Sequence, residues 1–302
     1  ESTSVMIGAD RDKVYPIYEF VPIGKRDVIK RAYEEYIQSK VFDIVNTAIP
    51  IPVRQVNGLG NDNQGGGVVI KDIDKNGQPD LILMGNDDNT PNRFWYWVIF
   101  NTDADGMNGR QSQRFWVPKT VSDVDRGAAI AIGDIDKNGM DDLVFMALDD
   151  NKGTLSFRYV IGWDLNVDGS CRYFSDKVII PTNMGRKADG AGIALYDING
   201  NGILDMILMQ YDAPSGGPNQ FRYKIYYDLS SDGKSWTGTS VNYYVPTTFG
   251  RTADGAGVTV GNIDTDPRPD IILTAYDDPD GANNFRYMVL HNVDKSGNPV
   301  SV

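Results

Sequence analysis

Two observations predict that the chain is an all-β protein, a β-propeller of four-stranded antiparallel blades. A pattern of short apolar runs separated by turns rich in Gly, Asn and Asp occurs four times over residues 58–302, and each copy contains about four candidate strands. Equivalent positions in successive copies lie 62, 63 and 65 residues apart. Repeats of this length, each too small to bury both faces of its own sheet, are typical of propeller blades.

The repeats are predicted to form one structural domain of about five blades, with four as the alternative. Four blades cover residues 58–120, 121–183, 184–248 and 249–302. Residues 1–57 are predicted to be a degenerate blade that lacks its inner strand, because Val5–Asp10 aligns with Ile82–Asp87 of the next repeat. A helical insertion is predicted at about residues 26–40, where apolar residues recur with a period of 3.6. In the four-blade alternative, Phe42–Val53 completes the final blade.

The third strand of each repeat carries a Phe followed two positions later by a Tyr, so the two side chains share one face of the strand. These pairs are Phe94 and Tyr96, Phe157 and Tyr159, Phe221 and Tyr223, and Phe285 and Tyr287. We predict that they pack between neighbouring blades, with sugar-stacking platforms as the alternative. The last strand of the final repeat is predicted to be short or absent.

An acidic segment follows the first strand of every repeat and predicts a cation loop. Oxygen-bearing side chains stand at places 1, 3, 5 and 9, and three copies have Gly at place 6, an arrangement that suits a hard cation such as calcium. An EF-hand is excluded, because there is no Glu at place 12 and no helix on either side. Turn formation alone explains the Gly and Asn but not the Asp at place 9 of all four copies. The four loops are Asp72–Asp80, Asp134–Asp142, Asp197–Asp205 and Asn262–Asp270.

The inner strand, the D-x-[DN]-x-[DN]-G-x-x-D loop and the apolar second strand together resemble the FG-GAP or VCBS repeats of integrin alpha-subunit heads and bacterial surface proteins. The resemblance covers residues 58–302 well and residues 1–57 weakly. It implies three to four calcium ions, with backbone carbonyls from Gln78, Met140, Ile203 and Arg268 at place 7. It implies side-chain ligands at Asp72, Asp74, Asn76, Asp80, Asp134, Asp136, Asn138, Asp142, Asp197, Asn199, Asn201, Asp205, Asn262, Asp264, Asp266 and Asp270. The fourth loop departs from the pattern, with uncharged Asn262 at place 1 and Pro267 at the Gly place.

Composition limits the partners and the location. A net charge of −12 argues against nucleic acid and anionic membranes as partners, and no apolar run is long enough to span a bilayer. Loops of this kind bind calcium at the levels found outside cells, which favours a secreted or cell-surface location. The single Cys171 excludes an internal disulfide and leaves the redox compartment open.

A second set of candidate residues precedes the inner strands, at Arg186, Asp189, Arg251 and Asp254. These residues belong to the related segments K-A-D-G-A-G and T-A-D-G-A-G and are predicted either to ring one mouth of the propeller channel as ligand-binding groups or to form tight entry turns. No catalytic constellation stands out, because the chain has one Cys and one His. His291 occupies the slot of Trp163 and Tyr227 in sister repeats and reads as a strand residue, with a general base as the alternative.

The sequence therefore predicts a calcium-stabilised recognition or adhesion module outside the cell that is not an enzyme. Its leading partner class is glycan, which would make it lectin-like and carbohydrate-binding. A protein-binding or structural module of a larger surface protein, with a cell-surface protein as partner, is the alternative. A polysaccharide lyase or hydrolase built on a propeller is the third hypothesis.

Overall fold

The computed structural model describes residues 63–87, 93–103, 108–118, 125–151, 154–181, 188–212, 220–246, 253–264, 266–277 and 284–300. The chain divides into two compact units, Glu1–Val53 and Arg54–Val302, and all described residues belong to the second unit. The predicted degenerate blade and helical insertion lie outside the described residues. Within the described ranges the secondary structure is all β, as predicted, and no helix there is long and apolar enough to cross a membrane.

Four antiparallel sheets follow one another along the chain, and each lies within one of the four sequence repeats. Blade 1 contains β1 (Asn63–Lys71), β2 (Asp80–Asp87), β3 (Arg93–Phe100), β4 (Arg110–Gln111) and β5 (Phe115–Trp116). Blade 2 contains β6 (Asp125–Gly133), β7 (Asp142–Asn151), β8 (Thr154–Leu165), β9 (Cys171–Phe174) and β10 (Val178–Pro181). Blade 3 contains β11 (Ala188–Tyr196), β12 (Asp205–Asp212), β13 (Gln220–Leu229), β14 (Trp236–Thr239) and β15 (Tyr243–Pro246). Blade 4 contains β16 (Ala253–Gly261), β17 (Asp270–Asp277) and β18 (Asn284–Leu290).

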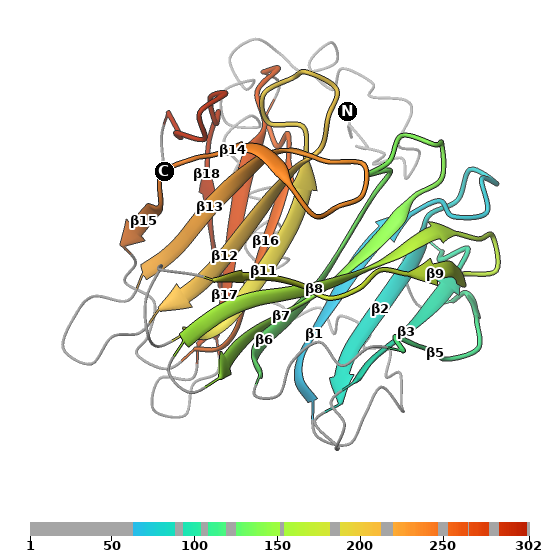
Figure 1. Cartoon of the computed structure of the whole chain (residues 1–302). Coiled ribbons are helices and arrows are strands. Elements are labelled where there is room, and N and C mark those ends of the chain that lie inside the picture. Colours follow the sequence, from blue (N-terminus) through green and yellow to red (C-terminus); the bar gives the residue numbers. More distant parts are fainter. Residues whose placement is uncertain are drawn as a thin grey trace, which may run out of the picture. The chain divides into compact units, whose positions relative to one another are not determined.

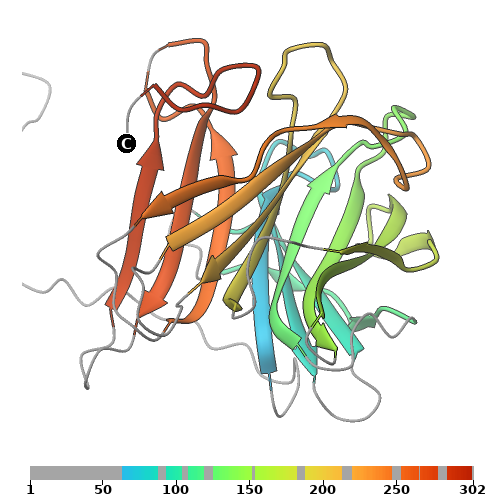
Figure 2. The same ribbon diagram turned by 60° about the vertical axis from the view of Figure 1, so that its left-hand side comes forward.

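The sheets are arranged as the blades of a β-propeller, which confirms the predicted fold class. Their inner strands β1, β6, β11 and β16 lie side by side in chain order, as Figures 1 and 2 show from two directions. Glycines allow this close approach. A Cβ added at Gly190 would lie 2.5 Å from the backbone nitrogen of Ala256, and one at Gly192 would lie 2.7 Å from that of Val258. The small residues of the inner strands are therefore required by backbone contact between blades.

Apolar layers fill the spaces between consecutive blades. The recurrent Phe and Tyr of the third strands lie in these layers, since Phe94, Tyr96, Phe157, Tyr159, Phe221 and Tyr223 are all buried. All three hydroxyl groups reach into the next blade: Tyr96 Oη donates to Cys171 Sγ at 3.4 Å, and Tyr159 and Tyr223 donate to the carbonyl oxygens of Gly233 at 2.7 Å and Gly297 at 3.0 Å. Packing between blades, the first of the two predicted roles, is confirmed for these residues.

The two ends of the described array differ from its interior. On β18, Phe285 and Tyr287 are 70% and 67% exposed, whereas their equivalents in the other three blades are buried. On β1, Val68 and Ile70 are also exposed, although Ile130, the equivalent of Val68 on β6, is buried. The described part therefore presents one apolar sheet face at each end.

The fourth strand of blades 1 to 3 is broken into two short strands that pair with different parts of the same third strand. A Ser lies at each break: Ser112, Ser175 and Ser240. In blade 2, Ser175 donates its backbone N–H to the carbonyl of Ile161, and its hydroxyl oxygen accepts the Ile161 N–H. At each break the outer strand contains one more residue than the third strand, and this β-bulge interrupts the regular pairing. Among the described residues, blade 4 has three strands and no fourth, in line with its predicted short or absent last strand.

Candidate metal sites

Each predicted cation loop is the hairpin that joins the first two strands of a blade. Loop 1 is Asp72–Asp80, loop 2 is Asp134–Asp142, loop 3 is Asp197–Asp205 and loop 4 is Asn262–Asp270. The residue at place 9 pairs with the last residue of the inner strand, as in Lys71 with Asp80 and Gly133 with Asp142. All four loops therefore occupy the same position in their blades.

The Asp at place 9 is fully buried in every loop and holds the hairpin closed. In loop 2, Asp142 accepts the backbone N–H of Ile135 at 2.9 Å with Oδ2 and that of Asp164 at 2.9 Å with Oδ1. Asp80, Asp205 and Asp270 make the same pair of contacts in their own blades. This Asp thus ties the loop to the end of the third strand as well as offering oxygen to an ion.

Loops 1 and 2 bring the predicted carboxylates together. Asp72, Asp74 and Asp80 each offer an oxygen within 4.8 Å of the others, and the same holds for Asp134, Asp136 and Asp142. In loop 1, Asp74 Oδ1 is buried without a hydrogen-bond partner. Such an oxygen is costly to bury unless an ion or water binds it. These two groups could each hold a metal ion.

The backbone of loops 1 to 3 is shaped by left-handed residues at places 4 and 6. Lys75 and Gly77 have φ angles of 57° and 89°, and Lys137 and Gly139 have angles of 60° and 89°. This curl lets the place 1 carboxylate accept two loop amides: in loop 1, Asp72 accepts the N–H groups of Asn76 at 3.0 Å and Gly77 at 2.8 Å. At place 7, Gln78, Met140, Ile203 and Arg268 donate N–H to the side chain at place 5. Cation binding by their carbonyls stays a prediction.

Burial opposes ionisation in these loops. Burial raises the pKa of Asp142 to about 6, despite the two amide hydrogen bonds that favour its ionised form. Burial also raises the pKa of Asp205. A divalent cation would stabilise both carboxylates in the ionised form, because an opposite charge within a few ångströms outweighs the loss of water.

Sequence reasoning missed one recurrent residue of these sites, an Asn or Asp at the C-terminal end of each third strand. Asn101, Asp164, Asp228 and Asn292 all have left-handed φ angles between 52° and 58°. Asp164 Oδ1 accepts Nδ2–H of Asn138 at 2.6 Å, and Asp228 Oδ1 accepts Nδ2–H of Asn201 at 2.6 Å. This contact fixes the orientation of the place 5 amide, whose oxygen accepts the place 7 N–H and keeps a lone pair for an ion. The signal was present in the sequence, as an Asn or Asp at the same position of all four repeats.

We expect Asp228→Gly to weaken calcium binding at loop 3 by roughly 10-fold to 100-fold, the usual effect of losing a residue that orients a metal ligand. Glycine keeps the left-handed backbone and removes only the carboxylate. Hydrogen bonds from Thr237, Asn199 and Asn201 lower the pKa of Asp228, so its charge is present at neutral pH. Asp228→Asn, which installs the residue of blades 1 and 4, is the control and should retain most of the affinity. Calcium titration calorimetry measures both, and equal affinities for Gly and Asn would contradict an orienting role.

Loop 3 brings together fewer carboxylates, because places 3 and 5 are Asn199 and Asn201. Asp197 accepts N–H groups from Gly200, Asn201 and Gly202, and Asn199 donates to Asp205 and Asp228. The predicted residues are therefore clustered here as well. Asp228 supplies a third negative charge near the loop, beside Asp205.

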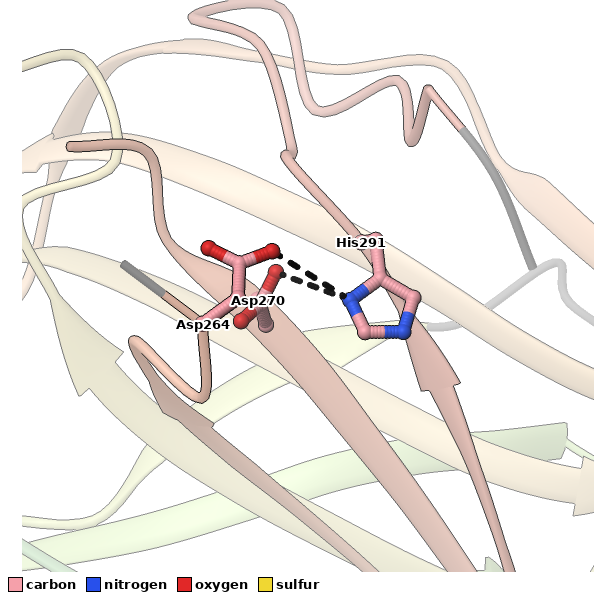
Figure 3. Close-up of side chains that lie close together, drawn as sticks. All are labelled: Asp264, Asp270 and His291. Carbon is pink, nitrogen blue, oxygen red and sulfur yellow. Dashed lines mark ion pairs between the residues drawn. The ribbon is translucent and has the colours of Figure 1, made fainter. Parts of the chain in front are cut away.

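Loop 4 has different chemistry around His291 (Figure 3). His291 Nδ1 lies 3.5 Å from Asp270 Oδ1 and 3.8 Å from Asp264 Oδ2, and the three groups could hold a metal ion. Pro267 stands at place 6, and because its ring fixes φ near −65° it cannot adopt the left-handed angle of Gly77 or Gly139. Burial alone would raise the pKa of Asp270, but the N–H groups of Asn292 and Ile263 and the nearby His291 lower it overall. The sequence treated His291 as a strand residue or base and did not place it beside the loop.

The second predicted set, Arg186, Asp189, Arg251 and Asp254, has side chains outside the part that the structure describes. The structure does describe Gly190 and Gly192 of these segments, which contact blade 4 closely. This contact explains why the residues there are small, and it does not require a bound ligand.

The single cysteine, Cys171, is partly buried. Burial raises the pKa of its thiol to about 12, so the thiol stays protonated at neutral pH, and Tyr96 Oη donates to it.

A groove opens between the loops of blades 3 and 4, with a volume of about 540 Å³. It is lined on one side by loop 3 and on the other by loop 4 and the turn after β18, and its polar residues include Tyr196, Asp197, Asn199, Arg268, Asp294 and Lys295. An equivalent but smaller groove of about 180 Å³ lies between blades 1 and 2, beside Lys75 and Met140. Both grooves therefore border the candidate ion sites.

The fold and these loops define the chain as a β-propeller with acidic hairpin loops that could bind metal. No protein-family model matches the sequence, and no curated protein matches it.

Proposed function

We propose that the protein is a calcium-stabilised recognition or adhesion module that acts outside the cell, with a carbohydrate as its leading ligand class. The observation that carries the calcium proposal is the convergence of three carboxylates in loop 1 and again in loop 2. Their donors are oxygens only, which favours a hard cation such as Ca²⁺. Calcium at levels found outside cells would suffice for loops of this type, and the resemblance to FG-GAP and VCBS repeats supports the same assignment.

The groove between blades 3 and 4 is the proposed recognition site. Arg268 and Lys295 supply positive charge, Asp197 and Asp294 supply acceptors, and Tyr196 supplies a ring. Mixed donors and acceptors around a shallow groove suit a polyhydroxylated ligand, and the two cations favour a saccharide that carries a carboxylate. An ion in loop 3 would add positive charge at the groove wall.

We expect the full chain to bind acidic saccharides on a glycan array in calcium and to lose this binding in excess chelator. The double variant Arg268→Ala and Lys295→Ala should lose most of the signal, because it removes both cations of the groove. Lys75→Ala, which alters the equivalent groove between blades 1 and 2, is the matched control and should bind normally. Binding that survives in the double variant would place the site elsewhere, and no binding to any glycan would refute the carbohydrate proposal.

A protein-binding or structural module of a larger surface protein is the second candidate function. The exposed apolar faces of β1 and β18 favour it, since they carry Val68, Ile70, Phe285 and Tyr287 at their surfaces. This second function would be supported if no glycan on the array bound and if the chain bound a cell-surface protein in a way that requires Tyr287. Release of unsaturated products from acidic polysaccharides, followed by ultraviolet absorbance, would instead select a polysaccharide-cleaving enzyme.

A further inference from the structure

We propose that loop 4 is a zinc-type site, which binds a borderline divalent metal through His291 Nδ1 and the carboxylates of Asp264 and Asp270, while loops 1 to 3 bind calcium. The inference rests on the cluster of Figure 3 and does not depend on glycan binding. Imidazole nitrogen is a common ligand of Zn²⁺, whereas Ca²⁺ prefers six to eight oxygens. The equivalent positions in the other blades are Phe100, Trp163 and Tyr227, which offer no nitrogen ligand.

The geometry fits a shared ion better than direct hydrogen bonds. The separations of 3.5 Å and 3.8 Å between His291 Nδ1 and the two carboxylate oxygens are longer than a hydrogen bond. Metal–ligand bonds of about 2.0 to 2.2 Å in a tetrahedral site place neighbouring donor atoms about 3.3 to 3.6 Å apart. Figure 3 shows Nδ1 facing both carboxylates and the other ring nitrogen pointing away. Asp270 Oδ1 already accepts the Asn292 N–H and retains a lone pair for a metal.

A second observation points to an unfilled ligand position. Asn292 Oδ1 is buried and has no hydrogen-bond partner. The equivalent oxygens of Asn101, Asp164 and Asp228 accept the amide of the Asn at place 5, but loop 4 has Asp266 there and no such donor. A metal, directly or through a bound water, would satisfy this oxygen.

Loop 4 has also lost what calcium needs. Place 1 is the uncharged Asn262, and its side-chain N–H donates to the carbonyl oxygen of Asp266. Pro267 has no N–H with which to hold a place 1 carboxylate, so the two departures from the repeat pattern accompany each other. Loop 4 therefore lacks the place 1 carboxylate and has instead the imidazole of His291, which lies just after β18.

The test uses the complete chain without a histidine tag, stripped of metal and then held in millimolar calcium. Equilibrium dialysis against ZnCl₂ should leave one Zn²⁺ per chain that calcium does not displace. His291→Phe installs the residue of blade 1 and should weaken zinc binding by more than about 100-fold, since loss of a direct ligand should exceed the usual cost of losing a residue that only supports one. Asp74→Asn is the control, and it should lose one calcium ion from loop 1 and keep the zinc. Equal zinc affinity in wild type and His291→Phe would overturn the proposal.

A measurement on the unaltered protein covers the case in which His291→Phe fails to fold. The chain contains one histidine, so its imidazole nuclear magnetic resonance signals report on this site alone. One equivalent of Zn²⁺ should shift the Nδ1 resonance, and calcium up to millimolar levels should neither produce nor reverse that shift. An imidazole that does not respond to zinc, or whose response calcium abolishes, would refute the zinc-type site while leaving the calcium loops untouched.

Discussion

Excess chelator should lower the melting temperature of the protein by roughly 6 to 12 °C at neutral pH. Extracellular-type sites with dissociation constants of about 0.1 to 1 mM each contribute on the order of 1 kcal/mol at millimolar calcium, because calcium binds only the folded loops. In a domain of this size each such contribution moves the melting temperature by about 2 to 4 °C. Loops 1 to 3 together give the expected shift.

Scanning calorimetry in calcium, in chelator and in chelator followed by excess calcium measures this effect. Magnesium is the control ion, since it is smaller and holds its water more tightly, and it should restore less stability than calcium. Identical melting curves with and without chelator would show that loops 1 to 3 do not bind calcium, whatever metal loop 4 binds.

Gly190→Ala should destabilise the propeller by about 3 kcal/mol or more, which is the upper range for overpacking in a close-packed interior. The added Cβ would lie 2.5 Å from the backbone nitrogen of Ala256 in the next inner strand. A backbone atom cannot rotate away as a flexible side chain can, so β11 and β16 would have to separate. Chemical denaturation of the variant and of the wild type measures the difference.

Gly255→Ala is the matched control, because Gly255 occupies the same position of the repeated segment in blade 4. No described atom lies within 4 Å of a Cβ added there. The substitution should therefore change the free energy of unfolding by less than about 1 kcal/mol, in the range of ordinary surface changes. Comparable destabilisation by the two alanines would show that contact between inner strands is not what requires Gly190.

The fold and loops 1 and 2 were predictable because their signals are local. A loop such as Asp72–Asp80 contains its own turn residues and oxygen ligands within nine positions, so no knowledge of distant contacts is needed. The spacing of two positions between Phe94 and Tyr96 likewise predicts that their side chains share one face of the strand. Both features depend on backbone geometry that short sequences determine.

The partners from the third strand were not predicted, because they depend on strand register. Asp164 lies 22 residues from Asp142 in sequence, and only the antiparallel pairing of β7 with β8 brings the end of one strand to the start of the other. His291 reaches Asp270 by the same pairing of β17 with β18. Once a hairpin is assumed, the residue at the C-terminal end of the third strand can be expected beside place 9 of the loop. The serine bulges could not be foreseen, since Ser occurs in strands, turns and loops alike.

The broken fourth strands have a consequence for how the molecule behaves at high concentration. A long, regular strand at the edge of a sheet offers a row of free backbone groups on which another chain can add and start an aggregate. In blades 1 to 3 the outer strands are two to four residues long, and Ser112, Ser175 and Ser240 interrupt their regular pairing. A second chain would find no continuous ladder there. The bulges thus make it harder for a strand of another chain to pair with the outer edges of these blades.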